Sequence, residues 1–393
     1  MMALQNFAVA NNPGLAITRL LRLATLLTAT LVSGCAYVHS KYSPPPDPRT
    51  QTLASNAPYA PPPGFGTPQA QVKLPSQPAK NAKADYRFFA YEKKPIQPLA
   101  QPNFRLKLER DYTLHYNLSH LSFPSAGDNG QADKITSAHY FQSKLPGKKK
   151  LVVILPIWGS SKYPPNTIAQ LVLDSHQGLT NVLLVEGERD FIDWQRIQAA
   201  QNEAEFVNLT RQYMMQRVLT NVIDMRRWLD WAETQDDIDP QRMSLVGFSI
   251  SSIVGSALYG VDRRLSSGVF IIGGANPAEI LSTCYWEPQE LRETITKRIG
   301  WDKQRYESVL EKIFDPINPA NLGAEVDPKR VLIFDSQDDT CIPESARQAL
   351  WEGMGRPERF SFLHDHKMSF MSMTPLGLNF MANRIYEFLD KNL

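Results

Sequence analysis

A serine lies between a short apolar run and a stretch of small residues. Ser249 follows Met243–Phe248 and precedes Ile250–Ser256, a pattern that predicts a strand, a tight turn and a helix. A serine on such a turn projects its hydroxyl away from the backbone, where a base can take its proton. The backbone amide of Ile250, at the start of the helix, would stabilise the oxyanion formed when that hydroxyl attacks an ester. The chemistry indicated is acyl transfer.

We expect the acid that orients the base in a loop after one of the later buried strands. Val331–Phe334 predicts a strand, and the acidic turn behind it contains Asp338 and Asp339. We place Asp335 at the end of the strand itself. Both Asp338 and Asp339 remain candidates at this stage, because acidic turns after strands are common.

We expect the base in the loop after the last predicted strand. Phe360–Leu363 predicts that strand, and His364 and His366 follow it. We favour His366 over His364 because its place in the loop allows it to reach Ser249. We expect no metal site, because no carboxylate or cysteine cluster accompanies the two histidines at a compatible spacing.

The elements around these residues predict a largely parallel sheet covered by helices on both faces. A helical stretch, Glu203–Trp231, separates the second and third of the buried strands. The buried strands expected are Leu151–Trp158, Asn181–Glu186, Met243–Phe248, Gly268–Ile272, Val331–Phe334 and Phe360–Leu363. The alternating segments before them predict antiparallel opening strands at Asn103–Glu109, Tyr112–Leu118 and Ile135–Phe141.

The segment Gly247-Phe248-Ser249-Ile250-Ser251 resembles the nucleophile elbow Gly-x-Ser-x-Gly of the α/β-hydrolase superfamily, with Ser251 in place of the last glycine. Together with Met225–Trp231 and Ile238–Met243, it is similar to the dienelactone-hydrolase and prolyl-oligopeptidase-like branches, over about residues 100 to 393. The resemblance implies an α/β-hydrolase fold with a mostly parallel eight-stranded sheet. It also implies a helical cap insertion, which we place at 275–326.

The same resemblance selects the acid and the base. The family pattern Gly-x-x-Asp-x-x-Val-Pro, aligned on Pro343, makes Asp339 the acid and puts Ser336 in place of the glycine. The family histidine, usually behind a glycine, corresponds to His366, and Asp365 stands at the glycine position. The triad implied is therefore Ser249, His366 and Asp339.

The second oxyanion donor in this family comes from the loop after the first parallel strand. In this chain that loop supplies the backbone amides of Ile157 or Trp158, which would act with the amide of Ile250. Cys284, at the base of the expected cap, and Cys341, beside Asp339, would form a disulfide or remain free thiols.

The amino terminus predicts export and lipidation. Arg19 and Arg22 precede a short apolar run, and Leu31–Cys35 resembles the bacterial lipobox, in which the cysteine is acylated. We expect a signal peptide at 1–34, Cys35 and a proline-rich disordered tether at 35–85, and the hydrolase domain at 86–393. Ala36 favours the outer membrane, facing the periplasm. A plain signal peptide or an uncleaved anchor is the alternative.

Composition and the absence of certain sequence motifs disfavour several classes of protein. The net charge of +2 disfavours nucleic-acid binding through a basic surface, and no phosphate-binding glycine loop or haem or iron–sulfur cysteine set is present. We expect a membrane-anchored serine hydrolase without a cofactor, acting on small-molecule or lipid esters as a carboxylesterase and less readily as a peptidase. The alternative is an inactive hydrolase-fold lipoprotein that binds an envelope partner.

Overall fold

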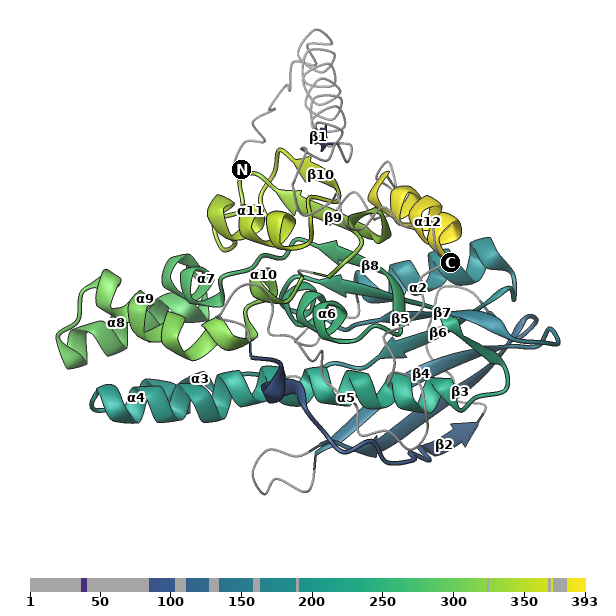
Figure 1. Cartoon of the computed structure of the whole chain (residues 1–393), viewed down its shortest axis with the longest axis horizontal. Helices are drawn as coiled ribbons and strands as arrows, with labels where there is room; N and C mark the ends of the chain where they lie inside the picture. Colours follow the sequence, from purple (N-terminus) through teal and green to yellow (C-terminus); the bar gives the residue numbers. More distant parts are fainter. Residues whose placement is uncertain are drawn as a thin grey trace, which may run out of the picture.

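A twisted ten-stranded sheet forms the centre of the protein in the computed structural model (Figure 1). The structure describes residues 37–40, 85–102, 111–126, 134–157, 163–188, 191–323, 325–366, 369 and 380–393. The strands are β1 (Tyr37–Ser40), β2 (Leu99–Pro102), β3 (Tyr116–Pro124), β4 (Ile135–Ser143), β5 (Lys149–Ile154), β6 (Thr180–Val185), β7 (Ile238–Phe248), β8 (Leu265–Ile271), β9 (Val331–Ser336) and β10 (Glu358–Phe362).

The strand order is β1-β10-β9-β8-β7-β5-β6-β4-β3-β2. Strands β5 to β10 are parallel to their neighbours within this group, and β4 is antiparallel to both β3 and β6. Eight of the nine expected strand segments correspond to β3 to β10, and the described residues include one further short antiparallel strand at each edge, β1 and β2. Because parallel strands end at a common edge, the loops that follow β5, β7, β9 and β10 meet there.

Most of the sequence-based strands are confirmed to within a few residues, and one is wrong in part. The segment predicted as a strand at Tyr112–Leu118 begins with a turn, and β3 starts at Tyr116. The cause is local, because the Asp111 carboxylate accepts a hydrogen bond of 2.9 Å from the amide of Thr113 and closes the turn. The predicted strand Asn103–Glu109 lies outside the described residues.

Helices cover both faces of the sheet. Val172 of α2 and Ile385 of α12 pack on one face, and Trp228 of α5 and Val254 of α6 pack on the other. The helices are η1 (Tyr86–Phe89), α2 (Pro165–His176), α3 (Trp194–Gln198), α4 (Glu203–Thr210), the π-helix η2 (Arg211–Met215), α5 (Gln216–Glu233), α6 (Ile250–Val261), α7 (Pro277–Thr283), α8 (Glu287–Ile299), α9 (Lys303–Phe314), η3 (Asp315–Ile317), α10 (Pro319–Leu322), η4 (Pro328–Arg330), α11 (Glu344–Gly353) and α12 (Phe380–Asn392). In the described part of the chain, no helix combines the length and apolar character needed to span a membrane.

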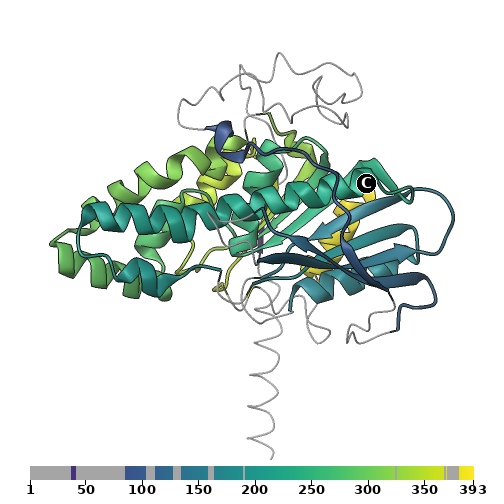
Figure 2. The same cartoon turned by 90° about the horizontal axis from the view of Figure 1, so that it is seen from below.

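The helical stretch expected at Glu203–Trp231 is confirmed, as α4, η2 and α5 in succession. Its first part, α4 and η2, packs against α9, and the preceding helix α3 packs against α8, so that two separate insertions form one helical lobe beside the sheet (Figure 2). Phe206 of α4 contacts the rings of Trp301 and Tyr306 at centroid distances of 5.7 and 5.6 Å. An exposed ion pair between Arg305 and Glu203, 2.7 Å long, joins the same helices at the surface.

A buried ion-pair network joins α5 to the far end of α6. Asp262, which follows α6, accepts hydrogen bonds from Arg226 at 2.9 Å and from Arg264 at 2.6 Å. The side chains of Arg226 and Asp262 are fully buried. The two arginines hold the pKa of the Asp262 carboxyl well below its usual range, although burial alone would raise it.

The tether predicted for residues 35–85 needs a correction at its start. Tyr37–Ser40 forms β1, which pairs antiparallel with β10 at the edge of the sheet, whereas the composition of the segment predicts a disordered chain. The physical reason is that β10 would be an edge strand without β1, and its backbone groups on that side can pair with any extended segment. The rest of the expected tether up to residue 84, Cys35 and the expected signal peptide lie outside the described residues.

Candidate active site

Ser249 lies on a sharp turn between β7 and α6. Its backbone angles are φ 51° and ψ −123°, a conformation that a residue with a side chain rarely adopts. Gly247 is required there, because a Cβ at this position would lie 2.5 Å from the carbonyl oxygen of Ser251. The Ser251 hydroxyl donates to the carbonyl of Phe248 at 2.9 Å and accepts from its amide at 2.8 Å. The serine that replaces the family glycine therefore closes the turn.

Ser249, His366 and Asp339 form a continuous hydrogen-bonded chain. The Ser249 hydroxyl lies 3.0 Å from Nε2 of His366, and Nδ1 of His366 lies 2.6 Å from Oδ2 of Asp339. A carboxylate only accepts, so Nδ1 donates to Asp339 and Nε2 is left to accept from Ser249. The amides of Cys341 and Ile342 donate to the other oxygen of Asp339 at 2.8 and 2.9 Å. The imidazole is thus held in the tautomer that can take a proton from Ser249.

The alternatives that the sequence left open lie elsewhere. Asp338 is exposed, and Asp335 is buried on β9, where it bonds to Arg359 at 2.6 Å. His364 is half-buried, and its backbone carbonyl accepts a hydrogen bond from the Ser336 hydroxyl. Of the two histidines, it is His366 whose side chain reaches Ser249.

A buried hydrogen-bond cluster supports the loop that carries His366. Ser336 contacts the carbonyl of His364, and the Ser369 hydroxyl donates to Ser336 at 3.1 Å and to the carbonyl of Asp365 at 3.0 Å. Arg347 of α11 donates to the carbonyl of Ser336. Sequence reasoning missed Ser369 and Arg347, and nothing in their sequence context marks them. Ser336 was noted only as a departure from the family glycine, whereas it links β9 to the His366 loop.

The candidate oxyanion donors come from the start of α6 and from the loop after β5. Ile250 is the first residue of α6, where an amide has no acceptor within its own helix. The loop after β5 brings Ile157 to the same edge of the sheet, and a Cβ at Gly187 would lie 3.3 Å from the Ile157 carbonyl oxygen. Gly187 therefore allows the loop after β6 to pass close to this segment. The other expected donor, Trp158, lies outside the described residues.

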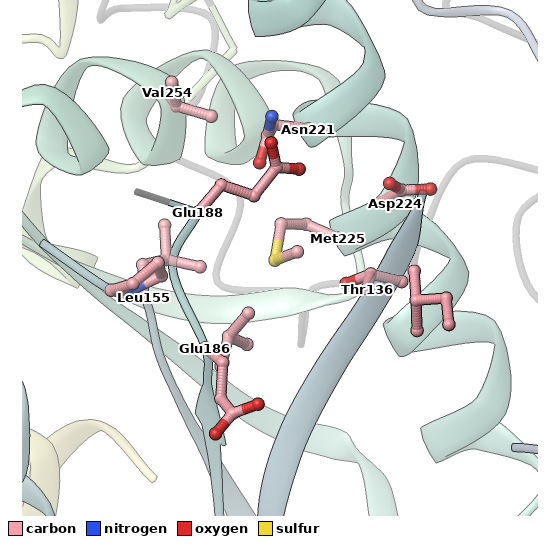
Figure 3. A pocket seen from close by; sticks show the side chains of 11 residues that line it. Thr136, Leu155, Glu186, Glu188, Asn221, Asp224, Met225 and Val254 are labelled. Carbon is pink, nitrogen blue, oxygen red and sulfur yellow. The ribbon is translucent and has the colours of Figure 1, made fainter. Parts of the chain in front are cut away.

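A small cavity of about 20 Å³ lies beside this loop, with room for about one water molecule (Figure 3). Leu155 and Val254 form part of its apolar wall, and Glu188 extends into it toward Asn221. Its complete lining is Ile135, Thr136, Leu155, Pro156, Val185, Glu186, Glu188, Asn221, Asp224, Met225 and Val254. Because of its size, we do not assign this cavity to a substrate.

The base of the expected cap reaches the site through one aromatic ring and a disulfide. The Trp286 ring lies edge-to-face with His366, with centroids 5.4 Å apart and planes at 83°. Two residues before Trp286, Cys284 forms a disulfide with Cys341, whose amide holds Asp339. The side chains that could hold a metal do not gather in groups of three anywhere in the described part of the chain.

Comparisons with known proteins agree on the fold. The structure is similar to the acetyl xylan esterase of Paenibacillus sp. R4, with a TM-score of 0.54, 15% identity, and coverage of 76% of this chain and 90% of that chain. It is also similar to acetyl xylan esterase 1 of Thermoanaerobacterium sp. JW/SL YS485, with a TM-score of 0.53, 14% identity, and coverage of 75% and 88%. No family model matches the chain, and no curated protein matches it in sequence. The protein has an α/β-hydrolase fold.

Proposed function

We propose that the protein is a membrane-anchored serine hydrolase that acts as a carboxylesterase. The observation that carries the proposal is the chain of contacts from Ser249 through His366 to Asp339, 3.0 and 2.6 Å long. The similarity to two acetyl xylan esterases supports the same class of reaction. The proposal concerns the class of reaction, the hydrolysis of a carboxylic ester.

In the proposed reaction, the Ser249 oxygen attacks the ester carbonyl carbon while Nε2 of His366 takes the hydroxyl proton. The amides of Ile250 and Ile157 hold the oxyanion, and Asp339 stabilises the imidazolium. The bond to the alcohol oxygen then breaks, and His366 returns the proton to the departing alkoxide. Water attacks the acyl-enzyme in the same way, which releases the acid and restores the Ser249 hydroxyl.

The departures from the family pattern do not favour the alternative of an inactive binding protein. Ser251 makes two hydrogen bonds that close the turn at Ser249, and Ser336 bonds to the loop that carries His366. Asp365 is exposed, and its carbonyl accepts a hydrogen bond from Ser369 within the loop that carries His366. Each departure is thus compatible with a working site.

Labelling by a fluorophosphonate probe tests the proposal directly. We expect the purified protein to be labelled and to hydrolyse short p-nitrophenyl esters, and Ser249→Ala to abolish both. Ser308→Ala, on α9 in the helical lobe, is the matched control and should keep both activities. A folded wild-type protein that is neither labelled nor active on esters would favour the binding protein instead.

Membrane attachment is the second part of the proposal. The lipobox-like segment ending at Cys35 supports acylation of that cysteine, and Ala36 supports sorting to the outer membrane, facing the periplasm. Metabolic labelling with a palmitate analogue should mark the wild type. Cys35→Ala should lose the label and leave the membrane fraction or accumulate as precursor. Labelling of Cys35→Ala equal to that of the wild type would exclude this anchor.

A further inference from the structure

The direction of β1 has a consequence for where a lipid anchor would lie. Strand β1 runs antiparallel to β10, with Tyr37 opposite Phe362 and Ser40 opposite Arg359. Phe362 is the last residue of β10, and β10 is parallel to β9, so this end of both strands belongs to the edge that carries Asp339 and His366. The first residue of β1 is therefore at the active edge of the sheet.

Covalent geometry then limits the distance between the anchor and the site. Cys35 precedes Tyr37 by two residues, which span at most about 8 Å. The partners of an antiparallel pair lie about 5 Å apart, and four residues lead from Phe362 to His366. The acylated cysteine can thus be no more than about 30 Å from His366. A flexible tether of about 50 residues would instead allow a typical separation of about 40 Å and a far larger maximum.

We propose that β1 clamps the lipid anchor to the active edge, so that the enzyme acts on esters embedded in the same membrane. The inference rests on the proposed function, both on Ser249 as nucleophile and on acylation of Cys35. It adds one claim to the proposed function. The height of the active site above the bilayer is set by the short connection between Cys35 and β1, and not by the longer segment between β1 and η1.

Apolar side chains at this edge are consistent with a membrane-resident substrate. Leu363, directly after β10, is 41% exposed, and Tyr285, next to Trp286, is 47% exposed. Tyr285 and Trp286 contact each other with ring centroids 5.3 Å apart, and Trp286 contacts His366. An acyl chain leaving the bilayer would therefore meet exposed apolar surface beside the nucleophile.

The test uses the acylated full chain in phosphatidylethanolamine–phosphatidylglycerol vesicles. Two esters of 4-methylumbelliferone serve as probes: the oleate, which partitions into the bilayer, and the butyrate, which remains in water. Inserting 24 glycine and serine residues between Ala36 and Tyr37 should lower the oleate-to-butyrate rate ratio at least fivefold and leave the butyrate rate unchanged. The same insertion after Ala60, which does not separate the anchor from β1, should leave the ratio unchanged.

An unchanged ratio with the first insertion overturns the inference, as does an equal fall of the ratio with both insertions. A wild type that hydrolyses neither ester contradicts the proposed function. The pairing of β1 with β10 is then still tested, by hydrogen exchange. In Val38→Pro/His39→Pro, one of the two substitutions removes an amide that faces β10. Hydrogen exchange at Phe360–Phe362 should then be faster than in the wild type, and equal exchange would exclude the pairing.

Discussion

Cys341 is joined by a disulfide to Cys284, and the two cysteines flank the candidate site from different segments. Cys341 presents its amide to Asp339, and Cys284 lies two residues before Trp286, whose ring contacts His366. The bridge thus ties the residue that orients the imidazole to the residue that covers it.

Removal of the disulfide should lower both stability and activity. The bridge closes a loop with a sequence separation of 57 residues, for which chain entropy predicts about 4 kcal/mol of stabilisation. Cys284→Ser/Cys341→Ser should therefore melt at a lower temperature and hydrolyse esters more slowly, and reductant should have the same effect on the wild type. The double variant should be insensitive to reductant. Two alkylatable thiols in the unreduced wild-type domain would contradict the bridge.

Truncation of Trp286 should impair catalysis more than folding. Edge-to-face aromatic contacts are worth about 1 kcal/mol beyond area burial, which corresponds to a factor of about five in rate when the contact orients the base. Trp286→Ala should lose about that factor in kcat/KM, whereas Trp286→Phe keeps a ring against His366 and should retain most of the activity. Steady-state kinetics with a short ester measure both. Equal activity of the alanine and phenylalanine variants would show that the ring does not position the base.

Loss of the Ser336 hydroxyl should loosen the loop that carries His366. The hydroxyl donates to the His364 carbonyl and accepts from Ser369, so Ser336→Ala removes both of the hydrogen bonds that join β9 to this loop through the hydroxyl. We expect a loss of about 1–3 kcal/mol in unfolding free energy and a lower kcat with little change in KM. Ser345→Ala, on the exposed side of α11, is the control for a serine without these contacts. A normal kcat in Ser336→Ala would contradict the positioning role.

Neutralising Asp262 should strongly destabilise the domain. Asp262→Asn leaves Arg226 and Arg264 without their shared carboxylate, and breaking a buried pair costs about 3–5 kcal/mol. By contrast, Glu203→Gln removes the exposed pair with Arg305 and should cost at most about 1 kcal/mol. Chemical denaturation compares the two. Similar losses of unfolding free energy in both variants would contradict the expectation that the buried ion pair matters more for stability than the exposed one.

The same carboxylate predicts an acid-dependent part of the stability. The pKa of Asp262 is lower in the folded protein than in the unfolded chain, because Arg264 and Arg226 outweigh the effect of burial. The unfolded chain therefore takes up the proton first as the pH falls. This contribution is complete above about pH 4, the ordinary pKa of aspartate, and is lost as the pH falls below it. Asp262→Asn should lack it, so the free energies of unfolding of the two proteins should converge in acid.

Much of the sheet could be predicted because its strands are local features. The strands β5 to β10 each contain a short group of apolar residues, and Ser249 is marked by the strand, turn and small-residue helix around it. The turn before β3 was missed because one side chain, that of Asp111, bonds to a nearby amide and interrupts an apparently alternating segment. Pattern alone does not register such a single contact.

The nucleophile candidate, the fold class and two short sets of partners for Ser249 could be predicted from the amino-acid sequence alone. The sequence left Asp338 beside Asp339 and His364 beside His366, since neighbours in sequence share the same local pattern. Only the tertiary structure separated them, because hydrogen bonds depend on distances of about 3 Å between residues that lie 117 positions apart, for Ser249 and His366, and 27 positions apart, for Asp339 and His366. The pairing of β1 with β10 could likewise not be predicted from the sequence. An edge strand accepts a partner through its backbone, which leaves almost no trace in side-chain composition.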